Sequence, residues 1–230
     1  MLNTKGMRFP LDVILVCIRW YVAYPLSYRH LEEMMEERGE FVDDSSINRW
    51  AIRFLPRLEK VFRNNKRPAG SSWRMDETYI KVNGQWKYLY RAVDKMGKTI
   101  DFLLSAKRDK AAAMRFFEKA MLANGVPEKV TMDKSGASKS AIEQMIENQD
   151  IEIMVRQVKY LNNIVEQDHR AIKRQTRPML GFKAFHAAKS VLAGIKFMHM
   201  IRKGQMMIPG GETISFADQF YALAGELYPA

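Results

Sequence analysis

Two β-rich segments, 73–82 and 85–94, flank the dipeptide Asn83-Gly84, and this arrangement constrains the fold more than any other feature of the chain. Asn-Gly is a strong hairpin signal because both residues readily adopt the left-handed conformation that a two-residue turn requires. A second turn then leads into another β-rich segment, 99–107. The sequence therefore predicts three consecutive antiparallel strands.

After these strands, the hydrophobic pattern predicts helices that alternate with short strands. A three-stranded meander followed by β-α units gives a mixed sheet with helices on its faces, so the predicted fold class is α/β. The expected helices lie near 109–124, 138–148, 162–179 and 183–203, and the expected strands at 130–133 and 151–155.

The first 62 residues instead carry apolar side chains at helical spacing. Ser27 can cap a helix that ends at Gly39, and another helix is expected from near Ser45. In that last helix Arg49 and Arg53 project from the side opposite the apolar stripe. Short helices with an outward polar face predict a small all-α domain of the helix-turn-helix type.

Residues 64–72 have the Pro, Gly, Ser and charge content of a linker. The predicted organisation is a helical domain at 1–62, a linker at 63–72, an α/β domain at 73–205 and a C-terminal tail at 206–230.

The charge of the chain favours a polyanionic partner. It holds 37 Lys and Arg against 26 Asp and Glu, a net charge of +11. Nine of the basic residues, and no acidic residue, lie between Arg170 and Lys203. Such a run is also compatible with a solvated helix face. We expect nucleic acid to be the partner.

The single cysteine, Cys17, excludes an intramolecular disulfide and a cysteine-based metal site, and it fits a reducing cytoplasm. The most apolar N-terminal run, 11–26, is interrupted by polar residues and is too short to span a bilayer. We expect a cytoplasmic protein, associated with the nucleoid and without a membrane partner.

Two aspartates are placed to bind a metal ion. Hard divalent cations prefer oxygen ligands, and a site that acts on phosphodiesters needs several carboxylates at one point. Asp76 lies inside a predicted strand, where Glu77 must point to the opposite face. Asp133 ends another strand, where α/β sheets often bind ligands, although an Asp there is also a common turn former or helix cap.

A third carboxylate, Glu166, lies on a predicted helix. Glu166, Arg170 and Lys173 share one stripe of that helix, and Arg177 continues it. The alternative is a surface ion pair between Glu166 and Arg170 that contributes only about 0.3–0.5 kcal/mol. Asp168 is a rival carboxylate, but it projects roughly opposite to Glu166.

The four histidines show no ligand spacing with a second His or Cys. We therefore expect core or DNA-facing positions for His30, His169, His186 and His199.

The chain as a whole resembles a known family. The segments that carry the resemblance are YPLSYRHLEEMMEERG, WRMDETYIKVNGQWKYLYRAVDKMGKTIDF, TMDKSGA, KYLNNIVEQDHRAIKR and GFKAFHAA. They are similar to the bacterial DDE transposases of the insertion-sequence-six family.

The resemblance implies a ribonuclease-H-like DDE catalytic domain at 73–205, with Asp76, Asp133 and Glu166 as its catalytic, metal-binding triad. It also implies two Mg²⁺ ions, which Mn²⁺ can replace. The implied enzyme is a polynucleotidyl transferase that binds terminal inverted repeats, cuts the transposon ends and joins them to target DNA by replicative, cointegrate-forming transposition.

Double-stranded DNA is then the partner, and we expect at least a dimer on it. Two alternatives remain: a DNA-binding regulator derived from a transposase, and a stand-alone nuclease that uses the same metals. The expected DNA-contacting residues are Arg49, Arg53, Arg170, Lys173, Arg174 and Arg177.

Overall fold

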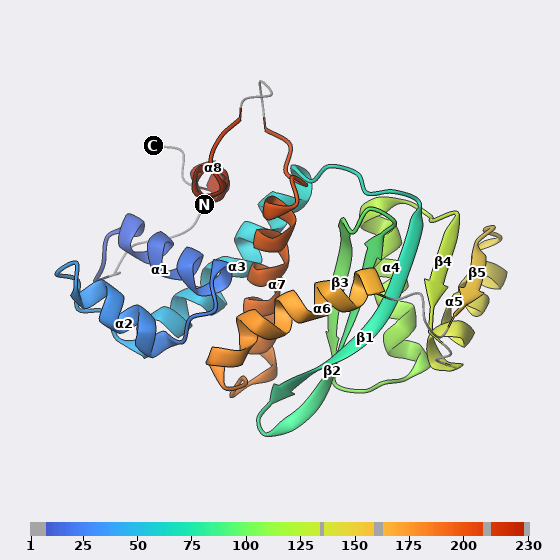
Figure 1. The fold of residues 1–230 in the computed structure, drawn as a ribbon, viewed down its shortest axis with the longest axis horizontal. Helices are drawn as coiled ribbons and strands as arrows, with labels where there is room; N and C mark the ends of the chain where they lie inside the picture. Colours follow the sequence, from blue (N-terminus) through green and yellow to red (C-terminus); the bar gives the residue numbers. More distant parts are fainter. Residues whose placement is uncertain (1–7, 134–135, 159–162, 209–212, 228–230) are drawn as a thin grey trace. The chain divides into compact units, whose positions relative to one another are not determined.

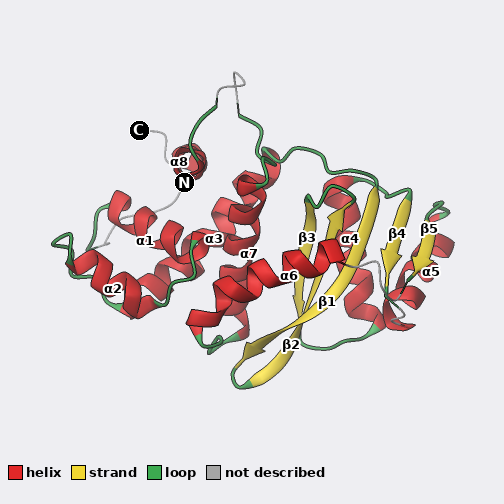
Figure 2. Ribbon diagram, in the orientation of Figure 1, coloured by secondary structure: helices red, strands yellow, loops and turns green. Residues whose placement is uncertain are grey.

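The computed structural model describes residues 8–133, 136–158, 163–208 and 213–227. The chain divides into two compact units (Figure 1). One consists of Pro68–Ala171, and the other combines Met1–Arg67 with Ile172–Ala230. Figure 2 shows that the strands all lie in the first of these and that the second is helical.

The described part of Pro68–Ala171 contains a five-stranded sheet with the order β3-β2-β1-β4-β5. Strands β1, β2 and β3 are antiparallel neighbours, whereas β4 and β5 run parallel to β1. This mixed sheet with flanking helices confirms the predicted α/β, ribonuclease-H-like fold class. The strands are β1 (Ser72–Val82), β2 (Gln85–Asp94), β3 (Thr99–Ser105), β4 (Lys129–Met132) and β5 (Met154–Gln157).

The turn between β1 and β2 confirms the hairpin prediction. Asn83 and Gly84 have φ angles of 48° and 74°, and Val82 pairs with Gln85. Two consecutive residues in the left-handed region match the right-handed twist of the flanking strands.

The two faces of the sheet differ in character. Trp73 and Met75 of β1 pack in an apolar core with Val130 and Met132 of β4 and with helices α4 (Lys110–Asn124) and α5 (Gly136–Gln149). Because side chains alternate along a strand, Asp76 points to the other face. Helix α6 (Asn163–Thr176) crosses that face in Figure 1.

The second unit is built from helices that are distant in sequence. Helix α7 packs against α3, and α1 and α8 contact both of them. The buried α7 residues include Val191, Ile195 and Phe197. The bounds are α1 (Leu11–Ala23), α2 (Tyr28–Glu36), α3 (Asp44–Asn64), α7 (Phe185–Arg202) and α8 (Phe216–Leu227).

This division differs from the domain limits that we expected from the sequence. The unit that contains the sheet ends at Ala171, within α6, and not near residue 205. The physical reason is that the apolar surface of α7 is buried by N-terminal helices.

Helix α8 was not predicted, because its segment was assigned to a tail. Its buried residues are Phe220, Leu223 and Ala224, and the ring of Phe220 stacks on that of Phe197 with centroids 6.2 Å apart. The helix is therefore held by tertiary packing.

The N-terminal helices are capped largely as expected. The Ser27 side chain accepts from the His30 amide, and the His30 ring in turn accepts from the Ser27 amide, which completes a capping box. Gly39 has a φ of 77°. Helix α3 begins at Asp44 with Asp43 as its cap, one residue before the expected start at Ser45.

Two other predicted elements have slightly different bounds in the structure. Strand β5 spans Met154–Gln157 instead of 151–155, because its register follows β4, in which Lys129 pairs with Met154. The expected helix at 162–179 becomes α6 followed by a short 3₁₀ turn, Arg177–Met179, at Pro178; residue 162 lies outside the described residues. In the described part of the chain, no helix is both long enough and apolar enough to cross a membrane.

Gly194 tests the packing of α7 on the N-terminal helices. A Cβ atom at Gly194 would lie 2.8 Å from side-chain atoms of both Val22 and Leu55, which are fully buried. Gly194→Ala should therefore lower the free energy of unfolding by about 1–3 kcal/mol in a urea titration.

The matched control is Gly225→Ala in α8, where, among the described residues and apart from its own chain neighbours and the nearby helix backbone, no atom lies within 4 Å of the added Cβ. Because alanine favours helix, this variant should keep or raise stability, by up to about 1 kcal/mol. Equal effects of the two substitutions would contradict the close packing at Gly194.

Candidate active site

Asp76 lies on β1 with its side chain on the sheet face that α6 crosses. Its side chain is 22% exposed, and its Oδ2 lies 3.1 Å from Nε2 of His169 on α6. An internal strand thus holds a partly open carboxylate in a fixed place.

Asp133 directly follows β4, the strand parallel to β1. The parallel register pairs Trp73 with Val130 and Arg74 with Thr131. If this register were continued by two residues beyond Arg74 and Thr131, Asp76 would pair with Asp133, which follows the carboxyl end of β4. Asp133 is half-buried. One predicted carboxylate therefore lies on β1, and a second directly follows the adjacent parallel strand β4.

Glu166 lies in the first turn of α6 and is exposed. The neighbouring Val165 is fully buried, so the predicted division of this helix into a packed and an open side is confirmed there. Three residues further along, His169 reaches Asp76. Residues i and i+3 are neighbours on a helix surface, so Glu166 lies one turn from the helix residue that contacts the sheet carboxylate.

The three carboxylates are not gathered into one cluster in the structure. Among the described residues, no group of three or more His, Cys, Asp or Glu side chains could hold a metal ion. Residues 134–135, which follow Asp133, and 159–162, which precede α6, lie outside the described residues. The donors themselves fit a hard divalent cation, because all three are carboxylates.

The rival carboxylate Asp168 has a different role. It is buried and forms an ion pair with Arg91, a residue of β2 that is also fully buried. The expectation that Asp168 projects away from Glu166 agrees with its burial, since Glu166 is exposed. Asp168 therefore neutralises the buried charge of Arg91.

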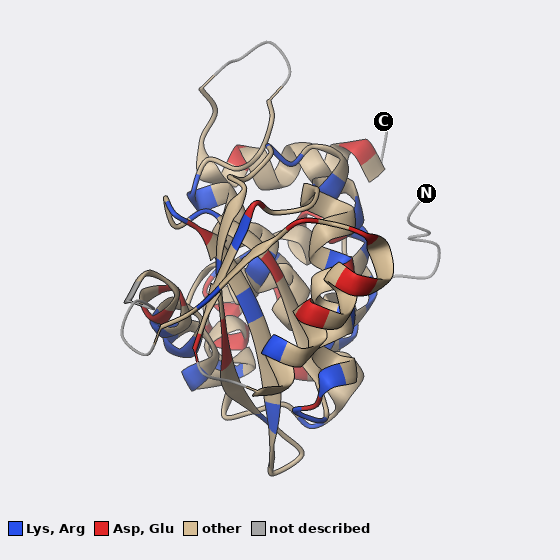
Figure 3. Ribbon diagram, turned by 90° about the vertical axis from the view of Figure 1, so that its right-hand side faces the viewer, with Lys and Arg blue, Asp and Glu red and all other residues tan. Residues whose placement is uncertain are grey.

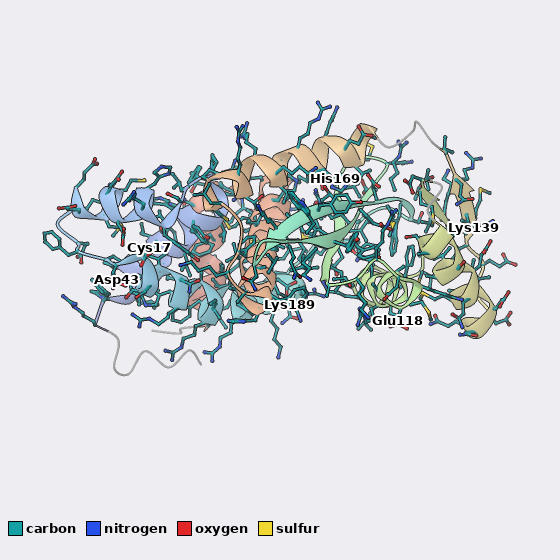
Figure 4. The ribbon with its side chains drawn as sticks, turned by 90° about the horizontal axis from the view of Figure 1, so that it is seen from below. Cys17, Asp43, Glu118, Lys139, His169 and Lys189 are labelled. Atoms are coloured by element: carbon teal, nitrogen blue, oxygen red, sulfur yellow. The ribbon has the colours of Figure 1, made fainter. Side chains whose placement is uncertain are left out.

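His169 links Arg91 to Asp76, a connection that the sequence did not reveal. Its Nδ1 lies 3.1 Å from Nη1 of Arg91, and its Nε2 lies 3.1 Å from Oδ2 of Asp76. The His169 side chain is 8% exposed, and Figure 4 labels the residue on α6. The expected core position is therefore correct, but the histidine is also a polar bridge to the candidate site.

Arg91 remains cationic near neutral pH. Burial lowers its pKa to about 9, and the negative charge of Asp76 opposes this shift. In the antiparallel register Arg91 pairs with both Asp76 and Phe102, so the three side chains form a row on one face. The guanidinium lies 4.2 Å from the centre of the Phe102 ring.

Glu77 points to the opposite face, as the alternation of strand residues predicted. It forms an ion pair with Arg108 and accepts a hydrogen bond of 2.8 Å from Ser138 on α5. Burial by itself lowers the pKa of Arg108. Glu77, Tyr79 and Asp133 raise it by more, so the pKa of Arg108 lies above its ordinary value. Glu77 is thus occupied elsewhere and does not compete with Asp76.

The cations predicted to contact DNA are all exposed. Figure 3 shows Lys and Arg on helices and strands alike. Arg49 donates to the Ser46 hydroxyl over 2.9 Å, and Arg53 lies 5.6 Å from the Phe54 ring centre. Arg170 belongs to the unit that contains the sheet. The other cations predicted to contact DNA belong to the helical unit: Lys173, Arg174 and Arg177.

Comparisons with known proteins place these features in a family. A family model described as "DDE domain" matches residues 70–205. The transposase for insertion sequence-like element IS431mec of Staphylococcus aureus is 38% identical over 198 residues, which cover 85% of this chain and 87% of the relative. The transposase for insertion sequence element IS257 in transposon Tn4003, from the same species, is 37% identical over the same shares.

Solved structures of retroviral integrases are also similar. The HTLV-2 integrase catalytic core domain in complex with magnesium covers 64% of this chain and 94% of its own, with 16% identity and a TM-score of 0.46. The catalytic core domain of BIV integrase covers 70% and 99%, with 13% identity and a TM-score of 0.45.

The domain match defines this chain as a DDE-type polynucleotidyl transferase. It belongs to the insertion-sequence-six family of DDE transposases, as its identity to the two staphylococcal transposases shows.

The two acidic residues of α6 should differ in their effect on stability. Asp168→Ala leaves the charge of Arg91 buried without its ion-pair partner, and such a change destabilises proteins by about 3–5 kcal/mol. Glu166→Ala removes an exposed side chain and should change the free energy of unfolding by no more than about 0.5 kcal/mol. Urea denaturation without divalent metal compares them. Similar losses for both variants would contradict the separation of roles.

Proposed function

We propose that this protein is an active transposase that binds the terminal inverted repeats of its insertion sequence and catalyses metal-dependent strand cleavage and strand transfer. Asp76, Asp133 and Glu166 are the catalytic residues of the proposal. What supports it is that Asp76 lies on β1 with 22% of its side chain exposed and that Asp133 directly follows β4, the parallel neighbour of β1.

The same carboxylates would hold the metal. Mg²⁺ fits their hard oxygen donors, and Mn²⁺ can take the same ligands. Bound there as a pair, such ions would polarise the attacked phosphate and stabilise the attacking and leaving oxygens of an in-line displacement.

The residues of the chain supply position and charge. Strand β1 fixes Asp76, and Asp133 directly follows β4, so the reacting phosphate would meet ligands that need little reorganisation. The exposed cations Arg170, Lys173 and Arg174 of α6 would hold DNA phosphates beside Glu166. Arg177, just after the helix, extends the same surface.

The DNA partners are the terminal inverted repeats and the target duplex. We assign end recognition to residues 1–62, in which Arg49 and Arg53 project from α3. The connection of α2 to α3, 37–43, is longer than the 3–4 residues usual in a helix-turn-helix. Because two ends must be joined to one target, the protein would act as at least a homodimer on DNA. The proposed outcome is a cointegrate, formed at the nucleoid in the cytoplasm.

Removal of any one carboxylate of the triad should abolish catalysis. Asp76→Asn, Asp133→Asn and Glu166→Gln each remove a ligand charge while keeping the side-chain size, so cleavage and joining in Mg²⁺ should fall below detection. Affinity for end DNA should stay within about twofold in gel-shift titrations. Glu143→Gln, an exposed carboxylate of α5, is the matched control and should keep wild-type activity. Near-normal joining by a triad variant would remove that residue from the assignment.

The same assay separates the alternative functions. With a 3′-hydroxyl end donor, a target plasmid and Mg²⁺, a transposase gives joined product. A stand-alone nuclease gives cleavage only, and a regulator gives binding only.

Arg49 and Arg53 should determine specificity for the ends. An arginine that reads a base loses roughly 1–3 kcal/mol of binding and relaxes specificity when it is changed to Ala, whereas a phosphate contact weakens all sequences alike. Titrations of Arg49→Ala and Arg53→Ala with repeat and scrambled duplexes measure the difference. If the wild-type chain binds both duplexes equally, the recognition assignment fails.

A further inference from the structure

A series of polar contacts runs from Arg91 on β2 to Asp76 on β1, the central strand of the sheet. It begins at Arg91, continues through His169 and ends at Oδ2 of Asp76, and each contact of the histidine ring measures 3.1 Å. Arg91 has no exposed surface and His169 has 6%. Bulk water is therefore excluded from the contact between Arg91 and His169.

The chemistry of Arg91 determines which group donates and which group accepts in each of these hydrogen bonds. A guanidinium group has only donors, so Nδ1 of His169 must accept a hydrogen bond from Arg91. The imidazole proton then lies on Nε2 and is donated to Asp76. Arg91 thus selects one tautomer of the histidine.

Arg91 itself is held on three sides. Asp168 pairs with its Nη2, the Phe102 ring lies 4.2 Å from its guanidinium carbon, and its backbone pairs with Asp76 across the sheet. Because Arg91 is fixed, the His169 ring that it contacts is held in place, and Nε2 of that ring donates to Asp76. This contact occupies Oδ2, and in the described structure Oδ1 accepts no hydrogen bond. With 22% of its side chain exposed, Asp76 retains a free oxygen for a ligand.

We propose that His169 is a positioning residue of the active site, which fixes the Asp76 carboxylate through Nε2 so that Oδ1 is presented to the divalent cation, and that Arg91 maintains the required tautomer. This inference rests on the proposed function, in which Asp76 is a metal ligand. Groups that orient a metal ligand typically change metal affinity roughly 10–100-fold when they are removed.

Two substitutions of His169 test the role. His169→Phe keeps a ring of similar size but removes both hydrogen bonds. His169→Gln keeps one acceptor for Arg91 and one donor for Asp76, so it should recover part of the loss. His186→Phe, at an exposed histidine of α7, is the matched control. For each variant the readouts are thermal unfolding without metal, the Mn²⁺ half-saturation concentration by calorimetry, and kcat and KM for strand transfer.

We expect His169→Phe to fold and to need at least about tenfold more Mn²⁺ for half-saturation, with a lower kcat and an unchanged KM for end DNA. His169→Gln should lie between this variant and the wild type, and His186→Phe should match the wild type. A folded His169→Phe with wild-type Mn²⁺ affinity and kcat overturns the proposal. If Asp76→Asn also binds Mn²⁺ like the wild type, the ligand assignment of the proposed function fails instead.

A measurement on the unaltered protein decides the matter if His169→Phe does not fold. The chain has four histidines, so spectra of ¹⁵N-histidine-labelled protein resolve their ring nitrogens, and the His169 signals are those lost in His169→Gln. At neutral pH we expect His169 to carry its proton on Nε2. A proton on Nδ1 alone would overturn the proposal, because Arg91 could not then donate to that atom.

Discussion

The buried charge of Arg91 is the constraint on which the architecture of the sheet unit depends. A guanidinium without solvent contact is costly unless it is paired and hydrogen-bonded. Asp168 and His169, two consecutive residues of α6, provide those partners. The helix is therefore tied to the sheet by charge compensation as well as by apolar packing, and its position over that face follows from the need to neutralise Arg91.

This attachment also explains how two faces of one sheet serve different purposes. Trp73 and Met75 bury their side chains against α4 and α5, where packing supplies the stability. Asp76, the next residue of β1 after Met75, faces α6 and contacts its polar residue His169. Strand alternation separates the two environments by one residue, so a carboxylate can lie next to the core without entering it.

Local rules made much of the fold predictable. Asn83-Gly84 indicated the hairpin because its left-handed turn depends on those two residues alone. Ser27 and Gly39 indicated the limits of α2 because a side-chain cap and a left-handed glycine are also local signals. Asp76 and Asp133 could be proposed as site residues because polar side chains within or just after apolar strands are costly without a ligand or partner. Family resemblance, and not local pattern, singled out Glu166.

The sequence by itself determined the strands, most of the helices and the exposed side of α3, because hydrophobic period and turn chemistry act over a few residues. Only the tertiary structure decided which distant segments share a core: α8 is held by Phe220 on Phe197, and α7 packs on α3. It also decided the roles of Arg91, Asp168 and His169. Arg91 is 77 residues from Asp168 along the chain, and no periodic pattern encodes a contact that forms only when a helix crosses the sheet.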